Sequence, residues 1–368
     1  MQDENNVISN FIVAGCHIYA LGMIAGLVGR WLIGDQSALL FIFNTFNFYL
    51  FLPTLLLPFA ALVLRRRDLW ASFAVLMVLW AALYGRLWWP KPQRQVHSAA
   101  GDATTLHVMT YNMWGGNPFP EEVVASIRAA DPDLVAIQEL NPQTAEVVRR
   151  DLRAVYPYQL LDPQHGVSGM GFLSRYPFRP ITATLPVEAW VGAPQLLTLD
   201  VEGTPVTVLH LHPRPTFFGT PAGMRWTIQT REQQLRAAMD FAATRSGPIL
   251  VLGDMNATDQ NEAHQILAQH FEDAWLEAGW GWGGTFPGRR AQDHLFARLV
   301  DAVVPSWLLR IDYIFYSSHF RAIEADVGPW DGASDHRPVR ATLLVSDGRV
   351  RDEEESERRS SDVSSGVQ

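Results

Sequence analysis

The sequence has very little cysteine and, over its first quarter, very little charge. Cys16 is the single cysteine of the 368 residues, so the chain contains neither a disulfide framework of its own nor a cysteine-based zinc site. The charged side chains between residues 7 and 90 are Arg30, Asp35, Arg65, Arg66, Arg67, Asp68 and Arg86. The mean hydropathy of +0.00 therefore averages an apolar segment and a polar one, which disfavours both a fully soluble protein and a polytopic transporter.

Two other absences narrow the class of protein. Lysine and arginine number 29 against 38 acidic residues, and the net charge of −9 disfavours a strong nonspecific binder of nucleic acid. The first six residues, Met-Gln-Asp-Glu-Asn-Asn, include no basic residue, and no small-residue cleavage site follows them. This pattern disfavours a cleaved signal peptide.

Long apolar runs occupy the first part of the chain instead. Residues 10–32, 38–64 and 69–89 are each long enough to cross about 30 Å of hydrocarbon as a helix. The expected helix ends carry tryptophans, whose rings favour the headgroup layer: Trp31, Trp70, Trp88 and Trp89. We expect residues 1–90 to be a membrane anchor of three transmembrane helices in contact with the lipid bilayer. A buried helical hairpin of a soluble domain is the alternative.

Basic residues in short loops predict the orientation of these helices. Arg65, Arg66 and Arg67 fill the connection between the second and third runs, and such a cluster favours the cytoplasm. The chain is then a multi-pass protein of the plasma (inner) membrane, with everything after the third run extracytoplasmic. Basic residues at the far end of the third run favour the reverse orientation.

The polar part of the chain divides into three segments. Residues 91–105 predict a linker, residues 349–368 predict a disordered charged tail, and residues 106–348 have the size of one large domain. Short β-type runs recur in this domain at residues 107–111, 134–137, 169–173, 196–201, 206–211, 249–252, 311–316 and 339–345. Helical patterns lie between some of them, at residues 121–130, 144–155, 223–243 and 261–269. Strands mixed with helices indicate an α/β sandwich with sheets inside and helices outside.

Polar side chains follow or begin several of these strands. They are Asn112, Gln138, Glu139, His210, His212, Asp254, Asn256, Asp312, Ser334, Asp335 and His336. Each alone is commonly a turn residue, a helix cap or part of a solvated sheet face. Together they indicate a site, because strand ends are where open α/β folds bind their ligands. Carboxylate and amide oxygens without thiolates suit a hard cation such as Mg²⁺ or Mn²⁺.

The residues that carry these side chains form motifs in a particular order. They are Tyr111-Asn112, Gln138-Glu139, Leu173-Ser174-Arg175-Tyr176-Pro177, Gly253-Asp254-Met255-Asn256, Arg310-Ile311-Asp312-Tyr313 and Ser334-Asp335-His336-Arg337-Pro338-Val339. This succession resembles the endonuclease/exonuclease/phosphatase superfamily, which includes DNase I, abasic-site endonucleases, neutral sphingomyelinases and inositol polyphosphate 5-phosphatases. The resemblance implies a four-layer α/β sandwich that hydrolyses phosphoesters with a divalent metal.

The resemblance also implies a role for each motif residue. Glu139 resembles the principal metal ligand of the family, with Asn112 beside it and Asp335 close enough to help hold a metal. Asp254 corresponds to the acid that orients or deprotonates the attacking water, and Asn256 to the amide that binds a phosphate oxygen. His336 would contact the same phosphoryl group, and Asp312 would orient its ring and favour its charged form.

Two further features bear on this resemblance: one departs from the family's motif pattern, and the other narrows the class of substrate. Many members of the family carry one histidine at the end of the middle strand, whereas this chain offers His210 and His212, of which His212 is nearer the strand end. Basic loops that grip DNA are not evident, and residues 275–307 are rich in Trp and Gly rather than Lys, which makes DNA a doubtful substrate.

Membrane attachment raises the effective concentration of the enzyme toward phosphates of lipids in the same membrane. The sequence therefore favours a membrane-tethered, divalent-metal-dependent phosphoesterase acting on a phosphoester or pyrophosphate. A lipid-linked phosphate is the favoured substrate. Trp280, Trp282 and Phe286 are candidates for an apolar rim, or are ordinary core and loop aromatics. The alternatives are a surface-bound nuclease that degrades extracytoplasmic DNA and a catalytically inactive membrane scaffold or binding protein. The sequence leaves the oligomeric state open.

Overall fold

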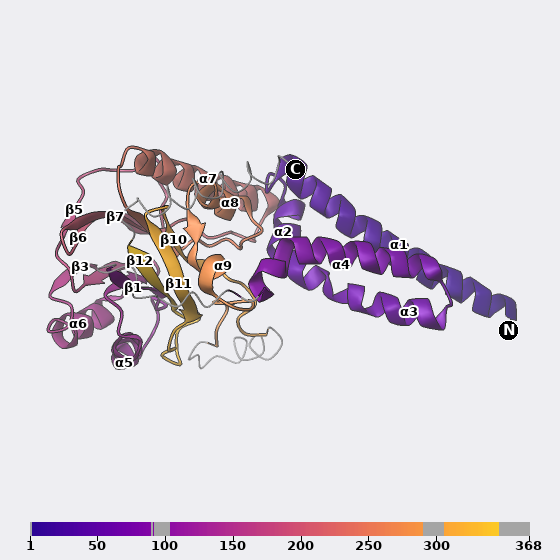
Figure 1. The fold of residues 1–368 in the computed structure, drawn as a ribbon, viewed down its shortest axis with the longest axis horizontal. Coiled ribbons are helices and arrows are strands. Elements are labelled where there is room, and N and C mark those ends of the chain that lie inside the picture. Colours follow the sequence, from indigo (N-terminus) through magenta and orange to yellow (C-terminus); the bar gives the residue numbers. More distant parts are fainter. Residues whose placement is uncertain (1, 90, 92–103, 290–304, 346–368) are drawn as a thin grey trace, which may run out of the picture.

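The computed structural model describes residues 2–89, 91, 104–289 and 305–345. The predicted tail and most of the predicted linker lie outside these residues. Within them, a bundle of long apolar helices leads into a domain with two β-sheets (Figure 1).

The first sheet has six strands in the order β11-β12-β1-β2-β4-β3. In chain order they are β1 (Thr105–Asn112), β2 (Leu134–Gln138), β3 (Tyr158–Asp162), β4 (Met170–Ser174), β11 (Phe320–Val327) and β12 (Val339–Val345). Only β1 and β2 run parallel, and helix α5 (Pro120–Ala130) makes the crossover between them. Asn112 and Gln138 are partners in this register, so both strands end at the same edge of the sheet.

The second sheet also has six strands, in the order β5-β6-β7-β8-β10-β9. They are β5 (Phe178–Pro180), β6 (Gly192–Val201), β7 (Thr204–His212), β8 (Ile249–Asp254), β9 (Glu272–Asp273) and β10 (Asp312–Tyr316). Here β7 and β8 form the parallel pair, joined by α7 (Pro221–Ala243). Strand β10 is antiparallel to β8 and begins with Asp312 opposite Asp254.

The two sheets pack face to face, with helices on their outer faces. The apolar core between the sheets includes Val108, Ala136, Phe172, Leu197, Val208, Leu252 and Ile314. A second cluster lies between the first sheet and helices α5 and α6 (Pro142–Asp151), and a third between the second sheet and helices α7 and α8 (Glu262–Ala268). The short α9 (Ala274–Ala278) follows β9. The four-layer α/β sandwich predicted from the sequence is therefore confirmed.

The N-terminal segment contains three helices that are long and apolar enough to span a membrane, as predicted. The first is α1 (Gln2–Ile33) and the third is α4 (Arg67–Trp88). The second is interrupted: α2 (Ala38–Leu50) leads into a 3₁₀ turn, η1 (Leu52–Leu56), and then α3 (Leu57–Val63). Pro53 and Pro58 lie in the first turns of η1 and α3, where the missing N–H costs no helical hydrogen bond.

The anchor packs directly against the two-sheet domain. The loop between α1 and α2, helix α2 and the end of α4 lie on the domain side, and the turn between α3 and α4 lies at the opposite end (Figure 1). Phe48 of α2 stacks on Trp282 with ring centroids 4.3 Å apart, and the Gly281 amide donates to the Leu87 carbonyl of α4 at 2.7 Å. Trp282, considered above as a rim residue, is thus part of the contact between anchor and domain.

Candidate active site

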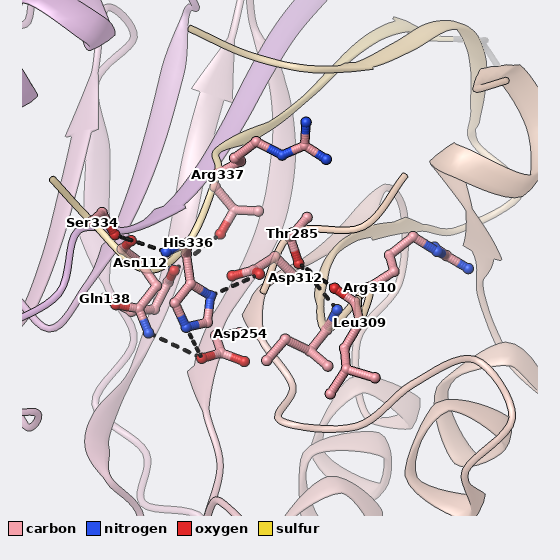
Figure 2. A network of polar contacts seen from close by, with 12 residues as sticks. Asn112, Gln138, Asp254, Thr285, Leu309, Arg310, Asp312, Ser334, His336 and Arg337 are labelled. Atoms are coloured by element: carbon pink, nitrogen blue, oxygen red, sulfur yellow. Dashed lines mark hydrogen bonds and ion pairs between the residues drawn. The ribbon is translucent and has the colours of Figure 1, made fainter. Parts of the chain in front are cut away.

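The parallel pair in each sheet brings the predicted site residues to one edge of the sandwich. Asn112 and Gln138 end β1 and β2, with Glu139 directly after β2. His212 and Asp254 end β7 and β8, and Asp312 begins the neighbouring β10. The loop before β12 adds Asp335 and, next to it, His336, which Figure 2 shows beside Asp312 and Asp254.

Gly253 permits the close approach of strands β7 and β8 just before Asp254. Its φ is +144°, and a Cβ atom at this position would lie 1.9 Å from the Leu211 carbonyl oxygen. A side chain here would collide with the backbone of the neighbouring strand, so glycine is required at this point of the Gly-Asp-Met-Asn motif.

His336 lies between two buried carboxylates. Its Nδ1 is 2.9 Å from Asp312 Oδ2, and its Nε2 is 3.7 Å from Asp254 Oδ2 (Figure 2). Burial alone would lower the pKa of His336, but the Asp312 and Asp254 carboxylates outweigh it and raise that pKa to about 10. The ring is therefore an imidazolium at neutral pH and presents a positive charge to the site.

Asp254 has a pKa shifted in the direction expected for a base near neutral pH. Burial raises the pKa of this carboxyl, and the nearby Asp312 raises it further, while His336 and a hydrogen bond from the Asn256 amide lower it. Asp254 Oδ1 accepts that amide at 2.9 Å, and Asp254 Oδ2 accepts from Asn112 Nδ2 at 3.0 Å. The carboxylate is thus oriented from both sides.

Asn112 joins Asp254 to Glu139. The Asn112 amide nitrogen also donates to Glu139 Oε1 at 3.1 Å, and the Gly115 amide donates to Glu139 Oε2 at 2.9 Å. Burial raises the pKa of Glu139 despite these donors. Glu139 keeps partial contact with solvent, and no arginine or lysine within the described residues forms an ion pair with it. Glu139 adopts a positive φ of +59°, a sparsely populated conformation that aims its side chain into the site.

The structure distinguishes the two candidate histidines of β7. His212 Nε2 lies 3.6 Å from Asp254 Oδ2, and burial lowers the pKa of His212 to about 3, so its ring is neutral. His210 is engaged elsewhere: its Nε2 is 2.7 Å from Gln138 Nε2, and its Nδ1 is 3.0 Å from Gln195 Oε1. His210 therefore links the two sheets, and His212 is the histidine that faces the site.

The remaining predicted residues lie around this group. Asn256 is partly exposed and has a backbone φ of +52°. Its side-chain amide donates to the Pro213 carbonyl at 3.2 Å. Asp335 is buried, and its charge contributes to raising the pKa values of both Glu139 and His336. Ser334 Oγ donates to the Asn112 carbonyl at 2.8 Å and accepts the His336 amide at 3.0 Å, which ties the two loops together.

Two groups of side chains could hold a metal ion. Asp254, Asp312 and His336 place potential ligand atoms within 4.8 Å of one another, and Asp312 Oδ1 is buried with no hydrogen-bond partner among the described residues. The other group is the one predicted from the sequence, Glu139 with Asn112 and Asp335; within it, Asn112 Nδ2 donates to Glu139 Oε1 at 3.1 Å. All of these donors except the imidazole are oxygens, which fits a hard divalent cation.

Three contributors to the site carry too little sequence signal to be assigned a role beforehand. The Gly115 amide acts through the backbone, and Gln138 contacts His210 from the opposite sheet. Phe286 packs its ring 4.8 Å from the His336 ring. Of these, Gln138 belongs to the Gln138-Glu139 motif without a role of its own, and Phe286 was considered only as a rim residue.

Two facing six-stranded sheets with helices on their outer faces, and a buried Asp/Asp/His group at one edge, define a DNase I-like protein. The sequence gives the family: the chain belongs to the Endonuclease/Exonuclease/phosphatase family, whose model matches residues 109–336. It is a phosphoesterase of that family by sequence and fold. Among curated protein sequences, none matches this chain.

Solved structures agree with this fold. TDP2 from C. elegans is similar, with a TM-score of 0.51 and 18% identity over 73% of this chain and 85% of that one. A truncated Caenorhabditis elegans TDP2 has a TM-score of 0.50 and 16% identity over 66% of this chain and 98% of its own. An endonuclease/exonuclease/phosphatase from Beutenbergia cavernae DSM 12333 is 22% identical over 66% of this chain and 72% of that one, with a TM-score of 0.48. At such identities the similarity to the two TDP2 structures shows the fold alone.

Proposed function

We propose that this chain is a membrane-tethered, divalent-metal-dependent phosphoesterase that hydrolyses a phosphoester or pyrophosphate of a membrane lipid by attack of water. One observation carries the choice of substrate. Phe217 and Phe218, in the loop that follows His212, are 55% and 60% exposed, and the Phe218 ring lies 6.5 Å from Phe41 of the anchor helix α2. Exposed aromatic rings beside a membrane helix are suited to the headgroup layer.

The loop that carries Phe217 and Phe218 contacts the candidate site residues through its backbone. It begins at Pro213, whose carbonyl accepts from the Asn256 side chain. Trp226, on the first turns of α7, is 54% exposed and lies under the Arg214 guanidinium at 5.8 Å. An apolar surface with one cation beside the site fits a lipid phosphate better than it fits DNA. The net charge of −9, with 29 basic against 38 acidic residues, also disfavours the nuclease alternative.

Each polar residue then has a role in the reaction. Asp254 orients the attacking water and accepts its proton, since its raised pKa makes it a better base near neutral pH. His336, held cationic by Asp312, binds the phosphoryl oxygen where negative charge develops. We assign Asn256 and His212, both in contact with Asp254, to the same phosphoryl group. Glu139, with Asn112 and Asp335, would hold the metal ion. When bound, Mg²⁺ or Mn²⁺ supplies positive charge that polarises the phosphoryl group.

A substrate panel tests this function. The purified full chain in detergent is incubated with phosphatidic acid, an isoprenyl pyrophosphate, sphingomyelin and plasmid DNA, with and without a chelator. We expect product release from at least one lipid that stops with chelator and exceeds release from DNA. The Glu139→Gln and His336→Gln variants, which keep side-chain size, should lose about 10²-fold or more of kcat. Full activity in both variants contradicts the mechanism, and cleavage of DNA alone supports the nuclease alternative.

Metal binding distinguishes the two candidate ligand groups. We expect Glu139→Gln to weaken Mn²⁺ binding about 10- to 100-fold, because it removes a partly exposed carboxylate that forms no ion pair with an arginine or lysine of the described residues. Asp312→Asn should change this affinity much less, because Asp312 is engaged by the His336 ring. Calorimetric titration of the full chain with Mn²⁺ measures both, and the reverse order of effects would place the metal at the Asp254, Asp312 and His336 group.

A further inference from the structure

The anchor helix α2 carries polar side chains on the face that meets the domain. Asn44, Thr45 and Asn47 are buried, although the stretch around them is strongly apolar. Asp35, in the loop just before α2, is also buried, with 2% of its surface exposed. Buried polar groups in an apolar helix are costly unless they are paired, so their partners show what they do.

Thr45 and Asp35 have partners more than 200 residues away in sequence, in the loop between β8 and α8 and at the first residue of α8. Asn44 and Asn47 have theirs within the anchor, Asp35 and Tyr84. Asp35 Oδ2 accepts the Glu262 amide at 2.8 Å, and its Oδ1 accepts from Asn44 at 2.7 Å. Arg30 Nε donates to the Gln260 carbonyl at 3.0 Å. The Thr45 hydroxyl is 3.2 Å from Asn261 Nδ2.

Asn261 links Thr45 of the anchor to Thr258, in the loop that follows β8. Its Oδ1 accepts from both the amide and the hydroxyl of Thr258, at 2.9 and 2.8 Å. Asn261 stands at the N-cap position of α8 but makes no capping hydrogen bond there. Asp35 of the anchor binds the first amide of α8 instead, so a residue of the membrane segment replaces the usual cap.

The loop held in this way begins with the site itself. Asp254 ends β8, Asn256 is two residues further, and Thr258 another two. The left-handed backbone at Asn256 is a conformation that the surroundings must maintain. Small displacements of groups that orient water and phosphate cost large factors in rate.

We propose that Thr45 and Asp35 of the anchor are positioning residues for the active site, acting through Asn261 and the first turn of α8 on the loop that carries Asp254 and Asn256. The anchor is on this view part of the catalytic unit rather than a passive tether. The activity test of this inference rests on the proposed phosphoesterase function.

Thr45→Val tests the contact with little change of volume. The full chain in detergent is assayed with bis(p-nitrophenyl) phosphate, a small soluble diester whose binding does not depend on a lipid surface. We expect kcat to fall about 3- to 30-fold with KM changed less than twofold, whereas Thr45→Ser, which keeps the hydroxyl, should retain the wild-type kcat.

The matched control is Thr54→Val. The Thr54 hydroxyl is also buried, but it bonds Tyr19 at 2.7 Å within the anchor and does not contact the domain. Equal losses in both variants would mean a structural effect and would overturn the proposal.

Hydrogen–deuterium exchange tests the same contact without any activity. In Thr45→Val and Asp35→Leu, amides of residues 255–262 should exchange faster than in the wild type, while those of β1 and β2 stay unchanged. Unchanged exchange in residues 255–262 would overturn the inference, whether or not a phosphoester is cleaved. Faster exchange in a chain that cleaves none of the substrates would support the contact and refute the proposed function alone.

Discussion

His336 carries its positive charge because two carboxylates face its ring. Asp312 and Asp254 raise the pKa of His336 to about 10, well above the usual value near 6.5. The cationic form therefore persists through neutral pH and is lost as the pH rises through about 10. Asp254, with its pKa raised to about 7, becomes a competent base only as the pH rises past that value. We infer that kcat/KM is highest between these two limits.

Asp312→Asn should move the alkaline limit of that profile. Removing the carboxylate lowers the pKa of His336, so the loss of kcat/KM at high pH should begin between about one and three pH units lower than in the wild type. The acid limit should move less, and toward lower pH, because Asp312 also raises the pKa of Asp254. Rates measured from pH 5 to 11 check both limits, and an alkaline limit that does not move would refute the role given to His336.

His210 and His212 differ in what their replacement should cost. His212→Ala should lower kcat by about 10²-fold with little change in thermal stability, since His212 faces Asp254 and its Nδ1 has no hydrogen-bond partner. His210→Ala should destabilise the domain by about 2–4 kcal/mol, because Gln138 and Gln195 lose a buried partner and a cavity opens between the sheets. Thermal unfolding and kcat, measured on both variants, separate the structural role of His210 from the catalytic role of His212. A His210→Ala variant that is stable but inactive would instead assign the catalytic role to His210.

At the scale of elements, the strands that carry the site were predictable and the edge strands were not. The runs at residues 107–111, 134–137 and 249–252 are buried central strands with strong apolar patterns. Strands β3 and β5 are partly exposed edge strands, and β9 has two residues, so none has the apolar alternation that predicts a strand. Strand β11 has a register shift between Ala322 and Glu324 that breaks its alternation.

The parallel pair β7 and β8 depends on Gly253. Gly253→Ala should destabilise the domain by about 3 kcal/mol or more, because its Cβ would overlap the Leu211 carbonyl in addition to the cost of a positive φ. Gly203→Ala is the matched control. Gly203 has a φ of +89° but open space around its Cβ position, so this variant should cost only about 1–2 kcal/mol. Thermal unfolding of the two variants measures the difference, and equal shifts would mean that the close approach to Leu211 is relieved elsewhere.

At the scale of the whole molecule, the sequence predicted an anchor and a domain but not the contact between them. Asp35, Asn44 and Thr45 are isolated polar residues in a long apolar segment, a pattern that membrane helices tolerate without any specific partner. The domain partners of Asp35 and Thr45 lie more than 200 residues further along the chain, and only the folded structure brings the two segments together. The candidate site residues could be singled out for the opposite reason: most of them stand at or next to the end of a recognisable strand.

The position of three arginines relative to the domain gives a prediction of membrane orientation. Arg65 and Arg66 lie in the turn between α3 and α4, and Arg67 begins α4; this turn is at the end of the anchor away from the domain (Figure 1). Since clustered arginines in a short loop favour the cytoplasm, the domain should be extracytoplasmic. Cys16→Ser removes the native thiol, and a cysteine is then placed at Thr184, exposed on the domain, or at Arg67.

We expect an impermeant maleimide to label Thr184→Cys in intact cells and to label Arg67→Cys only after the membrane is permeabilised. Arg65 and Arg66 remain in the second variant, so its charge bias is largely kept. The reverse pattern would place the domain, and with it the proposed lipid phosphate, on the cytoplasmic side. Equal labelling of both positions in intact cells would mean that the anchor does not separate them across the bilayer, which would contradict the membrane-spanning arrangement itself.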